Sequence, residues 1–364
     1  MDNDFVLAPA LVNVRFDLQP AANALQSLRL LNDLERLSGM HDWVTRTGTA
    51  LSPERLYKNK LIFGAFEPAL CIMEHRHDNF PALLDFVERQ KPESLITAMD
   101  EELDYMFTHY PEHMARVDKR VTMTELLRDR GQYIDFMNKI EDCTSDVMWG
   151  DAFDIAQNPA DMQRYLVEHL RYMWDNHLRA EWEHQLPMLN ESISAFSRLD
   201  FSDKTAIEAA RIVTNRDMRD LLEKKIVTSE TVTFVPSLHL GPYVSVHSEA
   251  GALSIFFGAR LPRGAQSTAI SEFSRAELLM RLNALADDTR LQILELLTQN
   301  DEMCAQDIIE RLDVSQSTIS RHLSQLRATG YIIERRREVS KCYSLNTDRV
   351  VDTLRALTNF LSRQ

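Results

Sequence analysis

Apolar residues recur with helical spacing along most of the first two thirds of the chain. From about residue 21 to 230 they follow a 3.6-residue period, interrupted at Pro and Gly. Two stretches differ: residues 5–17 end in alternating apolar and polar positions, and residues 231–262 are rich in β-branched and aromatic side chains separated by turn residues. We therefore predict a mainly α (α+β) fold, in which a helical N-terminal domain carries a small antiparallel sheet that the first strand can join.

The C-terminal segment has a pattern dense enough to predict each element. Residues 262–271 have linker composition and separate a predicted domain at 1–265 from one at 272–364. Leucine-rich stripes at 278–285 and 291–297 predict two helices, and two short helices follow at 305–312 and from 315 to just before Gly330. Two β-prone arms, 331–337 and 340–345, then flank Glu338-Val339, and a last apolar stripe covers 350–361. This order predicts a helix-turn-helix followed by a hairpin wing.

The helix after Ser315 has two different faces. Ile319, Leu323 and Leu326 share one face and should pack inward. The side chains predicted to point outward are Gln316, Ser317, Ser320, Arg321 and Gln325. Amides, hydroxyls and a guanidinium are the groups that read base edges in the major groove of duplex DNA.

The distribution of charge makes a DNA partner compatible with an acidic protein. The net charge of the 364 residues is −14, but residues 271–364 hold 13 Lys and Arg against 14 Asp and Glu. Within 315–345 six basic residues face only two acidic ones. The positive excess therefore lies on the predicted wing and recognition helix.

Other features of the sequence bound the location and the cysteine chemistry. No apolar run is long enough to span a membrane and the first residues lack the basic start of a signal peptide, so we expect a cytoplasmic protein without membrane contact. Four separated cysteines form no CxxC pair, which favours reduced thiols over disulfides.

Two runs, Leu285–Leu294 and Val314–Arg327, carry a specific family resemblance. They closely resemble the ArsR/SmtB winged-helix repressors over residues 272–364. The resemblance implies a homodimer formed by the first and last helices of this domain, an inverted-repeat operator in double-stranded DNA, and recognition by the helix at 315–329. The residues expected to contact DNA are Ser315, Gln316, Ser317, Thr318, Ser320, Arg321, His322, Gln325, Arg335, Arg336, Arg337 and Lys341.

The sequence departs from the family where its metal sites lie. Many such repressors bind metals through a Cys-x-Cys pair, whereas this chain has Cys304 followed by Ala305 and Gln306, and no His after His322. We predict no metal site in this domain and interpret Cys304 as a small buried apolar residue. Histidine groups upstream, 75 with 77, 109 with 113, and Glu181 with His184, are interpreted as surface or core residues.

A row of aromatic and imidazole side chains marks the N-terminal domain. It comprises Tyr165, His169, Tyr172, Trp174, His177 and Trp182. Such rows are mostly core, but the first four are our candidates for binding a small-molecule effector. No phosphate loop or catalytic motif occurs in 1–270, so we predict neither an enzyme nor a cofactor.

The function predicted is therefore a sequence-specific transcription regulator, a repressor controlled through its N-terminal domain by a non-metal signal. Three alternatives stay open: a protein-interaction module in which the winged helix serves assembly, a metal-responsive repressor with an atypical site, and a ligand-processing enzyme with a regulatory tail.

Overall fold

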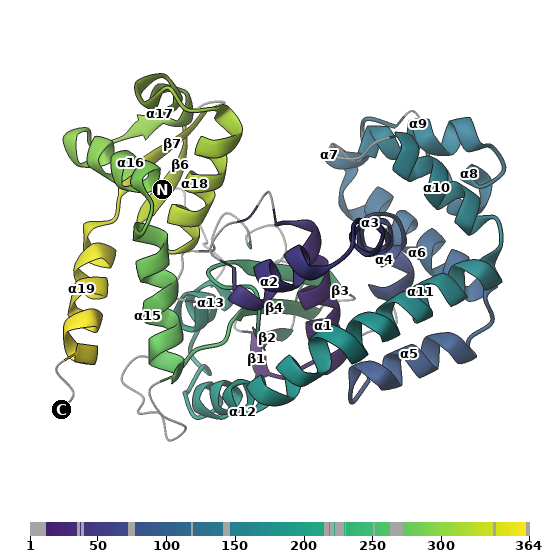
Figure 1. Ribbon diagram of the computed structural model, residues 1–364, viewed down its shortest axis with the longest axis horizontal. Helices are drawn as coiled ribbons and strands as arrows, with labels where there is room; N and C mark the ends of the chain where they lie inside the picture. The colour runs from purple at the N-terminus through teal and green to yellow at the C-terminus, as the bar shows by residue number, and fades with distance from the viewer. Residues whose placement is uncertain are drawn as a thin grey trace, which may run out of the picture. The chain divides into compact units, whose positions relative to one another are not determined.

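The first strand of the chain pairs with a strand from the far end of the N-terminal region. In the computed structural model (Figure 1), β1 (Asn13–Phe16) lies parallel to β2 (Thr231–Ser237). β2 is parallel to β4 (Ala252–Gly258), and β3 (Val244–Glu249) is antiparallel to β4 at the edge. The strand order is β1-β2-β4-β3. One strand from near the start of the chain and three strands that follow the long helical region thus form one sheet.

The sheet is mixed, so the expectation of an antiparallel sheet was wrong in two of its three pairings. Only β3 and β4 form the predicted antiparallel pair. β1 and β2 are separated in sequence by a long helical crossover, and such a connection allows parallel strands where a short turn would not. The expected strand at 5–17 is confirmed over Asn13–Phe16, and residues 5–11 lie outside the described residues.

One face of the sheet packs on the last two helices that precede β2 among the described residues. α13 (Ala206–Thr214) and the end of α12 (Arg179–Phe196) cover alternate strand residues, including Val232, Phe234 and Ile255. The ring of Phe234 lies 5.5 Å from that of Phe16. Alternation with period two places these side chains on one face, where burial of apolar area stabilises the sheet.

The structure describes residues 12–34, 37, 40–71, 77–117, 119–140, 146–214, 218, 222, 229, 231–249, 252–262, 272–337 and 340–361. The chain forms two compact units. One contains residues 1–18, 33–45 and 184–364, and the other contains 19–32 and 46–183. α2 (Asp42–Ala50) and α12 have residues in both.

The second unit consists of helices. They are α1 (Pro20–Arg29), α3 (Pro53–Leu61), α4 (Glu67–Cys71), α5 (Phe80–Arg89), α6 (Glu93–His109), α7 (Pro111–Met114), α8 (Met123–Leu126), α9 (Arg130–Ile140), α10 (Asp146–Ala156) and α11 (Pro159–Met173), with a 3-10 turn at Leu30–Asn32 and π turns at Ile62–Phe66 and Trp174–Leu178. α11 contacts α5, α6 and α10. Its Met162, Leu166 and Leu170 are fully buried, as the helical spacing predicts.

The C-terminal segment has the order of elements that the sequence predicted. The helices are α15 (Glu272–Leu285), α16 (Asp288–Gln299), α17 (Ala305–Leu312), α18 (Gln316–Ala328) and α19 (Thr347–Leu361), and the strands are β5 (Met303–Cys304), β6 (Ile332–Arg337) and β7 (Ser340–Leu345). The strand order is β5-β7-β6, with both pairings antiparallel. The predicted mainly α, α+β fold class is confirmed, whereas the predicted linker lies, from residue 263 on, outside the described residues.

A common core holds the C-terminal helices around α18. The predicted inward residues Ile319, Leu323 and Leu326 are all buried and join Ile293 and Ile308 in this core. α15 and α19 lie side by side (Figure 1). The helix-turn-helix is thus fixed by packing on its apolar faces rather than by its own helical propensity.

A disulfide bond joins Cys304 to Cys342, so the prediction of reduced thiols was wrong for this pair. Pairing of β5 with β7 places the two residues directly opposite each other. Cys304 is half-exposed and bonded rather than a buried apolar residue. The 38-residue separation gives no local signal of this contact, because only the strand pairing creates it.

None of the helices among the described residues combines the length and the apolar character that crossing a membrane requires.

Candidate nucleic-acid interface

The N-terminal end of α18 is held by the capping residue that the sequence predicted. The Oγ atom of Ser315 accepts a hydrogen bond from the backbone N–H of Thr318 at 3.3 Å. The same hydroxyl donates to Oγ1 of Thr318 at 2.8 Å. The side chains of Ser315 and Thr318 therefore position the helix and offer less to a DNA ligand than their place in the sequence suggests.

Three polar side chains remain exposed beyond this cap. Gln316, Ser317 and Ser320 are exposed, and Arg321 is half-buried. They lie in the first half of α18, and Ser317 and Arg321 lie on the side away from Ile319 and Leu323. An amide, two hydroxyls and a guanidinium on one exposed helix face provide the donors and acceptors that base edges require.

Gln325 does not belong to this exposed face, so its predicted orientation was wrong. Its side chain is buried, with 2% of its surface exposed. Gln325 lies in the last turns of α18, where its backbone carbonyl also accepts the hydroxyl of Thr329 at 2.9 Å. Of the residues predicted to point outward, those that are exposed or half-buried therefore all lie in the first half of α18.

His322 is also buried, which contradicts a place in direct contact with DNA. Its Nδ1 accepts a hydrogen bond from Nη1 of Arg290 at 3.3 Å, and it lies 3.7 Å from a carboxylate oxygen of Asp287. Burial is the largest effect and lowers the pKa of His322, which Arg290 lowers further and Asp287 raises. His322 is therefore a neutral core residue that fastens α18 to the start of α16.

Arg290 is a structural residue that the sequence did not reveal. Its guanidinium donates to the backbone carbonyls of Ala284 and Asn283, both at 2.7 Å. These carbonyls belong to the last turn of α15, whose acceptors have no intrahelical partner. Arg290 thus joins the end of α15, the start of α16 and the middle of α18.

The hairpin of β6 and β7 carries exposed positive charge next to one partly buried carboxylate. Arg335 and Lys341 are exposed. Glu334 lies 3.4 Å from Nζ of Lys341 and accepts a hydrogen bond from Arg327 at 2.7 Å. Arg336 lies opposite Lys341 in the strand register, and Arg337 opposite Ser340; the side chains of Arg336 and Arg337 lie outside the described residues. Glu334 thus offsets part of the positive charge of Lys341.

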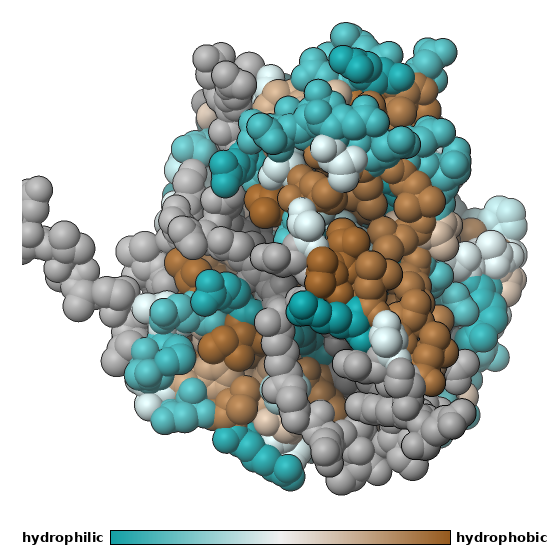
Figure 2. Space-filling model, turned by 90° about the vertical axis from the view of Figure 1, so that its left-hand side faces the viewer, coloured by the Kyte–Doolittle hydropathy of each residue, from teal (hydrophilic) through white to brown (hydrophobic). Residues whose placement is uncertain are grey.

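An apolar surface lies over α15 and α19, away from the polar face of α18. Its large exposed side chains are Leu279 at 49%, Val351 at 38%, Leu354 at 54% and Leu361 at 69% of their surface. Figure 2 shows this side of the molecule with a broad hydrophobic area. Leucine side chains exposed together in this way mark surfaces that bind other proteins.

Comparison with known proteins identifies the C-terminal domain. Residues 287–334 match the family described as bacterial regulatory protein, arsR family. Over 80 residues the chain is 38% identical to the transcriptional repressor SdpR of Bacillus subtilis, a match that covers 22% of this chain and 88% of SdpR. The chain belongs to the ArsR family. The match lies in its C-terminal region.

Two further relatives match the chain to different extents. The arsenic resistance transcriptional regulator ArsR1 of Pseudomonas putida is 39% identical over 64 residues, 18% of this chain and half of ArsR1. The transcriptional activator HlyU of Vibrio cholerae is 35% identical over 79 residues, 22% of this chain and 72% of HlyU. The predicted resemblance to ArsR-type regulators is confirmed, and the chain carries the DNA-binding domain of a transcriptional regulator.

Neither of the two positions that form the Cys-x-Cys pair in ArsR-type repressors carries a free thiolate in this chain. Cys304 is bonded to Cys342, and the amide of Gln306 donates to Glu310 at 3.1 Å. Gln306 replaces the second cysteine of the Cys-x-Cys pair that the resemblance implies. In this oxidised form Cys304 has no thiolate to give to a metal ion.

The candidate effector residues of the N-terminal region lie on two different sides of one helical segment. Tyr165, His169 and Tyr172 face α3: the guanidinium of Arg55 lies 3.8 Å from the ring of Tyr172, and His169 lies 3.3 Å from Oδ1 of Asn59. Trp174 packs instead on Phe80. The aromatic row crosses from α11 through a π turn into α12, so it is not one regular helix. Burial lowers the pKa of His169 to about 4.

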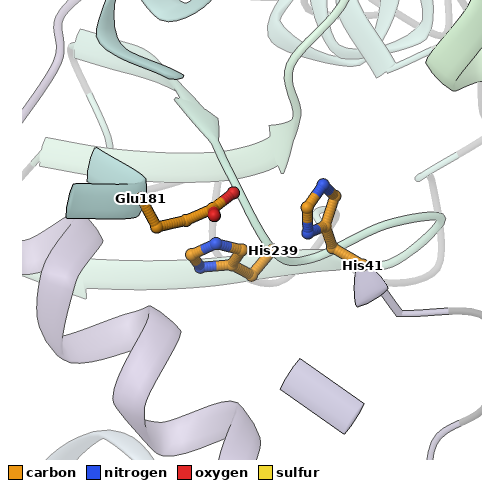
Figure 3. Close-up of side chains that lie close together, drawn as sticks. All are labelled: His41, Glu181 and His239. Carbon is orange, nitrogen blue, oxygen red and sulfur yellow. The ribbon is translucent and has the colours of Figure 1, made fainter. Parts of the chain in front are cut away.

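The histidine groups noted in the sequence do not converge where the structure describes them. α6 ends at His109, and His113 lies on α7 beyond Tyr110. His184 is exposed and His75 lies outside the described residues. His41 and His239, which sequence reasoning did not select, lie beside each other, with ring centroids 5.4 Å apart (Figure 3).

Proposed function

We propose that this ArsR-family chain is a dimeric, sequence-specific repressor that binds an inverted repeat and is controlled through its N-terminal domain by a non-metal signal. The observation that carries the proposal is the exposed polar face of Gln316, Ser317 and Ser320 on α18, within the segment that matches the family. This face suits the major groove, with Arg321 at its border.

The wing supports affinity rather than specificity in this proposal. Arg335 is exposed on β6, and Lys341 becomes available if DNA phosphate displaces Glu334. Charged side chains on a hairpin beside a recognition helix reach the phosphate backbone, which contributes a salt-dependent and sequence-independent part of the binding energy. We place Arg336 and Arg337 in the same role from their positions on β6.

Dimer formation through α15 and α19 supports recognition of an inverted repeat. Leu279, Leu354 and Leu361 expose apolar area that a second copy of the domain would cover. Two recognition helices related by a two-fold axis bind half-sites about 34–36 Å apart on one face of B-DNA. The name of SdpR as a repressor supports the repressive sign.

In this proposal residues 1–265 sense the signal and residues 272–364 bind DNA, so the first domain controls the operator affinity of the second. The thiolate position of the family is occupied by a disulfide and Gln306, which favours a signal other than metal bound at that position. Tyr165, His169, Tyr172 and Trp174 are the proposed contact residues for a small-molecule effector. An effector that favours one spacing of the two recognition helices changes operator affinity by its differential binding to the two states.

Selection of bound sequences from a random duplex library with the full-length protein tests this function. We expect enrichment of a two-fold symmetric motif, and salt-sensitive binding to it in a gel shift. A protein-interaction module would enrich no motif. A protein that binds DNA as a monomer would enrich a single half-site.

A further inference from the structure

The disulfide bond between Cys304 and Cys342 joins two parts of the C-terminal domain that have different places in DNA binding. Cys304 ends β5 and is the N-cap residue of α17, the first helix of the helix-turn-helix. Cys342 lies in β7, the second strand of the wing. α17 and β7 are in contact (Figure 1). The bond thus fastens the wing to the start of α17.

The two cysteines differ in their access to solvent. Cys304 is half-exposed, whereas Cys342 is 0% exposed, so a reagent in solution reaches Cys304 first. The thiolate is the form that reacts, and the free amides at the N-terminus of α17 stabilise negative charge at the position of Cys304. The carboxylate of Asp307, which accepts the backbone N–H of Cys304 at 3.2 Å, offsets part of this effect. Cys304 is therefore suited to react first and Cys342 to complete the bond.

The proposed DNA-binding function places this bond where disulfides are uncommon. A regulator that binds DNA works where the cell keeps thiols reduced, and the disulfides that form under such conditions are mostly transient and redox-sensing. The C-terminal domain also has an apolar core of its own, in which Ile293, Ile319 and Leu326 are buried. It is therefore unlike the small domains that depend on disulfides for their stability.

We propose that Cys304 and Cys342 form a redox-modification site, at which exchange with a small organic disulfide changes the affinity of the protein for its operator. This inference rests on the proposed DNA-binding function. It adds a signal that acts on the C-terminal domain itself, beside the control by the N-terminal domain.

The exchange takes place in two steps. The thiolate of Cys304 attacks one sulfur of the organic disulfide, whose S–S bond breaks; a mixed disulfide forms on Cys304 and the first thiolate leaves. The thiolate of Cys342 then attacks Sγ of Cys304, forms the bond between the two cysteines and releases the second thiolate. The released thiolates take up the protons that the cysteines lost. The cysteine pair is thus oxidised by two electrons, the organic disulfide is reduced to two thiols, and an excess of thiol reverses the reaction.

The exposed cations of the wing lie next to this bond. In the ladder of β6 and β7, Arg335 is directly opposite Cys342, and Lys341 precedes Cys342 in the chain. β5 is two residues long, and a ladder as short as its pairing with β7 is weak by itself. The disulfide therefore limits the movement of Arg335 and Lys341 relative to the helix-turn-helix. Because preordered side chains lose less entropy on binding, the disulfide form should bind the operator more tightly.

Peptide mapping of the full-length protein tests the exchange. The protein is equilibrated at different ratios of reduced glutathione to glutathione disulfide, blocked with iodoacetamide and digested. We expect the cross-linked peptide of Cys304 and Cys342 to disappear as the share of reduced glutathione rises and to return when glutathione disulfide is added back. In Cys342→Ala, glutathione should stay attached to Cys304, because the second thiol is missing. A cross-link that persists at every ratio, or that does not return, overturns the proposal.

Fluorescence anisotropy with the selected operator tests the effect on DNA binding. We expect the reduced protein to bind about tenfold more weakly than the oxidised protein, with a smaller salt slope because the wing loses phosphate contacts. Cys304→Ala should bind like the reduced wild type under both conditions. The matched control is Cys71→Ala, which changes a cysteine outside the C-terminal domain and should respond as the wild type does.

The wild type alone decides the result if Cys304→Ala does not fold. Equal or tighter binding of the operator by the reduced wild type overturns the redox proposal and leaves the DNA-binding function in place. If no operator is selected, the proposed function fails instead, and peptide mapping still decides whether the two cysteines exchange.

Discussion

Nη1 of Arg290 lies 3.3 Å from Nδ1 of His322, and both side chains are buried between α16 and α18. This contact joins α18 to α16, the helix that precedes the helix-turn-helix. The same guanidinium donates to two carbonyls at the end of α15. The orientation of α18 therefore depends on a buried cation that never needs to touch DNA.

Replacement of Arg290 should destabilise the C-terminal domain. Arg290→Met removes the hydrogen bonds to Ala284 and Asn283 and leaves their carbonyls without this donor, so we expect a loss of about 2–3 kcal/mol in the free energy of unfolding. Urea unfolding of the full-length protein measures this change. Arg311→Met, which alters an exposed arginine on α17, is the matched control and should change stability by no more than about 0.5 kcal/mol.

Replacement of Gln316 should affect particular base pairs. We expect Gln316→Ala to cost about 1–3 kcal/mol on the selected operator, because its exposed amide can bond to a base edge. Binding to a series of operators with single base changes should show that this loss disappears when the contacted base is replaced. Gln299→Ala, at the exposed end of α16, should leave all affinities unchanged. An equal loss on every operator would assign Gln316 to the phosphate backbone instead.

Arg335 and Lys341, the two exposed cations of the wing, should contribute differently to the salt dependence of DNA binding. Arg335→Gln should reduce the slope of log affinity against log salt by about one unit, because it removes one phosphate contact. Lys341→Gln should reduce the slope by less, because Lys341 already lies 3.4 Å from Glu334 and must break this ion pair. Fluorescence anisotropy across a range of salt concentrations measures both slopes. If both variants have the same slope as the wild type, the wing does not contact the phosphate backbone.

The apolar surface of α15 and α19 should be required for self-association. Leu354→Glu places a charge on a side chain that is 54% exposed and that the proposed dimer would bury, so the dimer should dissociate. Sedimentation velocity at several protein concentrations measures this change. Leu199→Glu alters a leucine that is 40% exposed outside the domain and should leave the association state unchanged. A dimer that persists in Leu354→Glu would place the interface elsewhere.

The local sequence determined much of the structure of α18 and of the C-terminal domain around it. Ser315 and Gly330 predicted the two ends of α18 because a hydroxyl cap and a residue at positive φ act within one turn of the helix. Ile319, Leu323 and Leu326 predicted its buried face because helical geometry alone sets their spacing. The order of helices and strands and the family resemblance followed from the same local patterns.

Tertiary packing decided which polar residues can reach a ligand and which distant residues meet. Gln325 and His322 carry polar groups on α18, yet neighbouring elements bury them, and helical periodicity does not include those neighbours. Cys304 and Cys342 meet through the pairing of β5 with β7. His41 and His239 meet because the loop after β2 lies against the start of α2. Contacts of this kind depend on the whole fold, and no short-range pattern in the sequence encodes them.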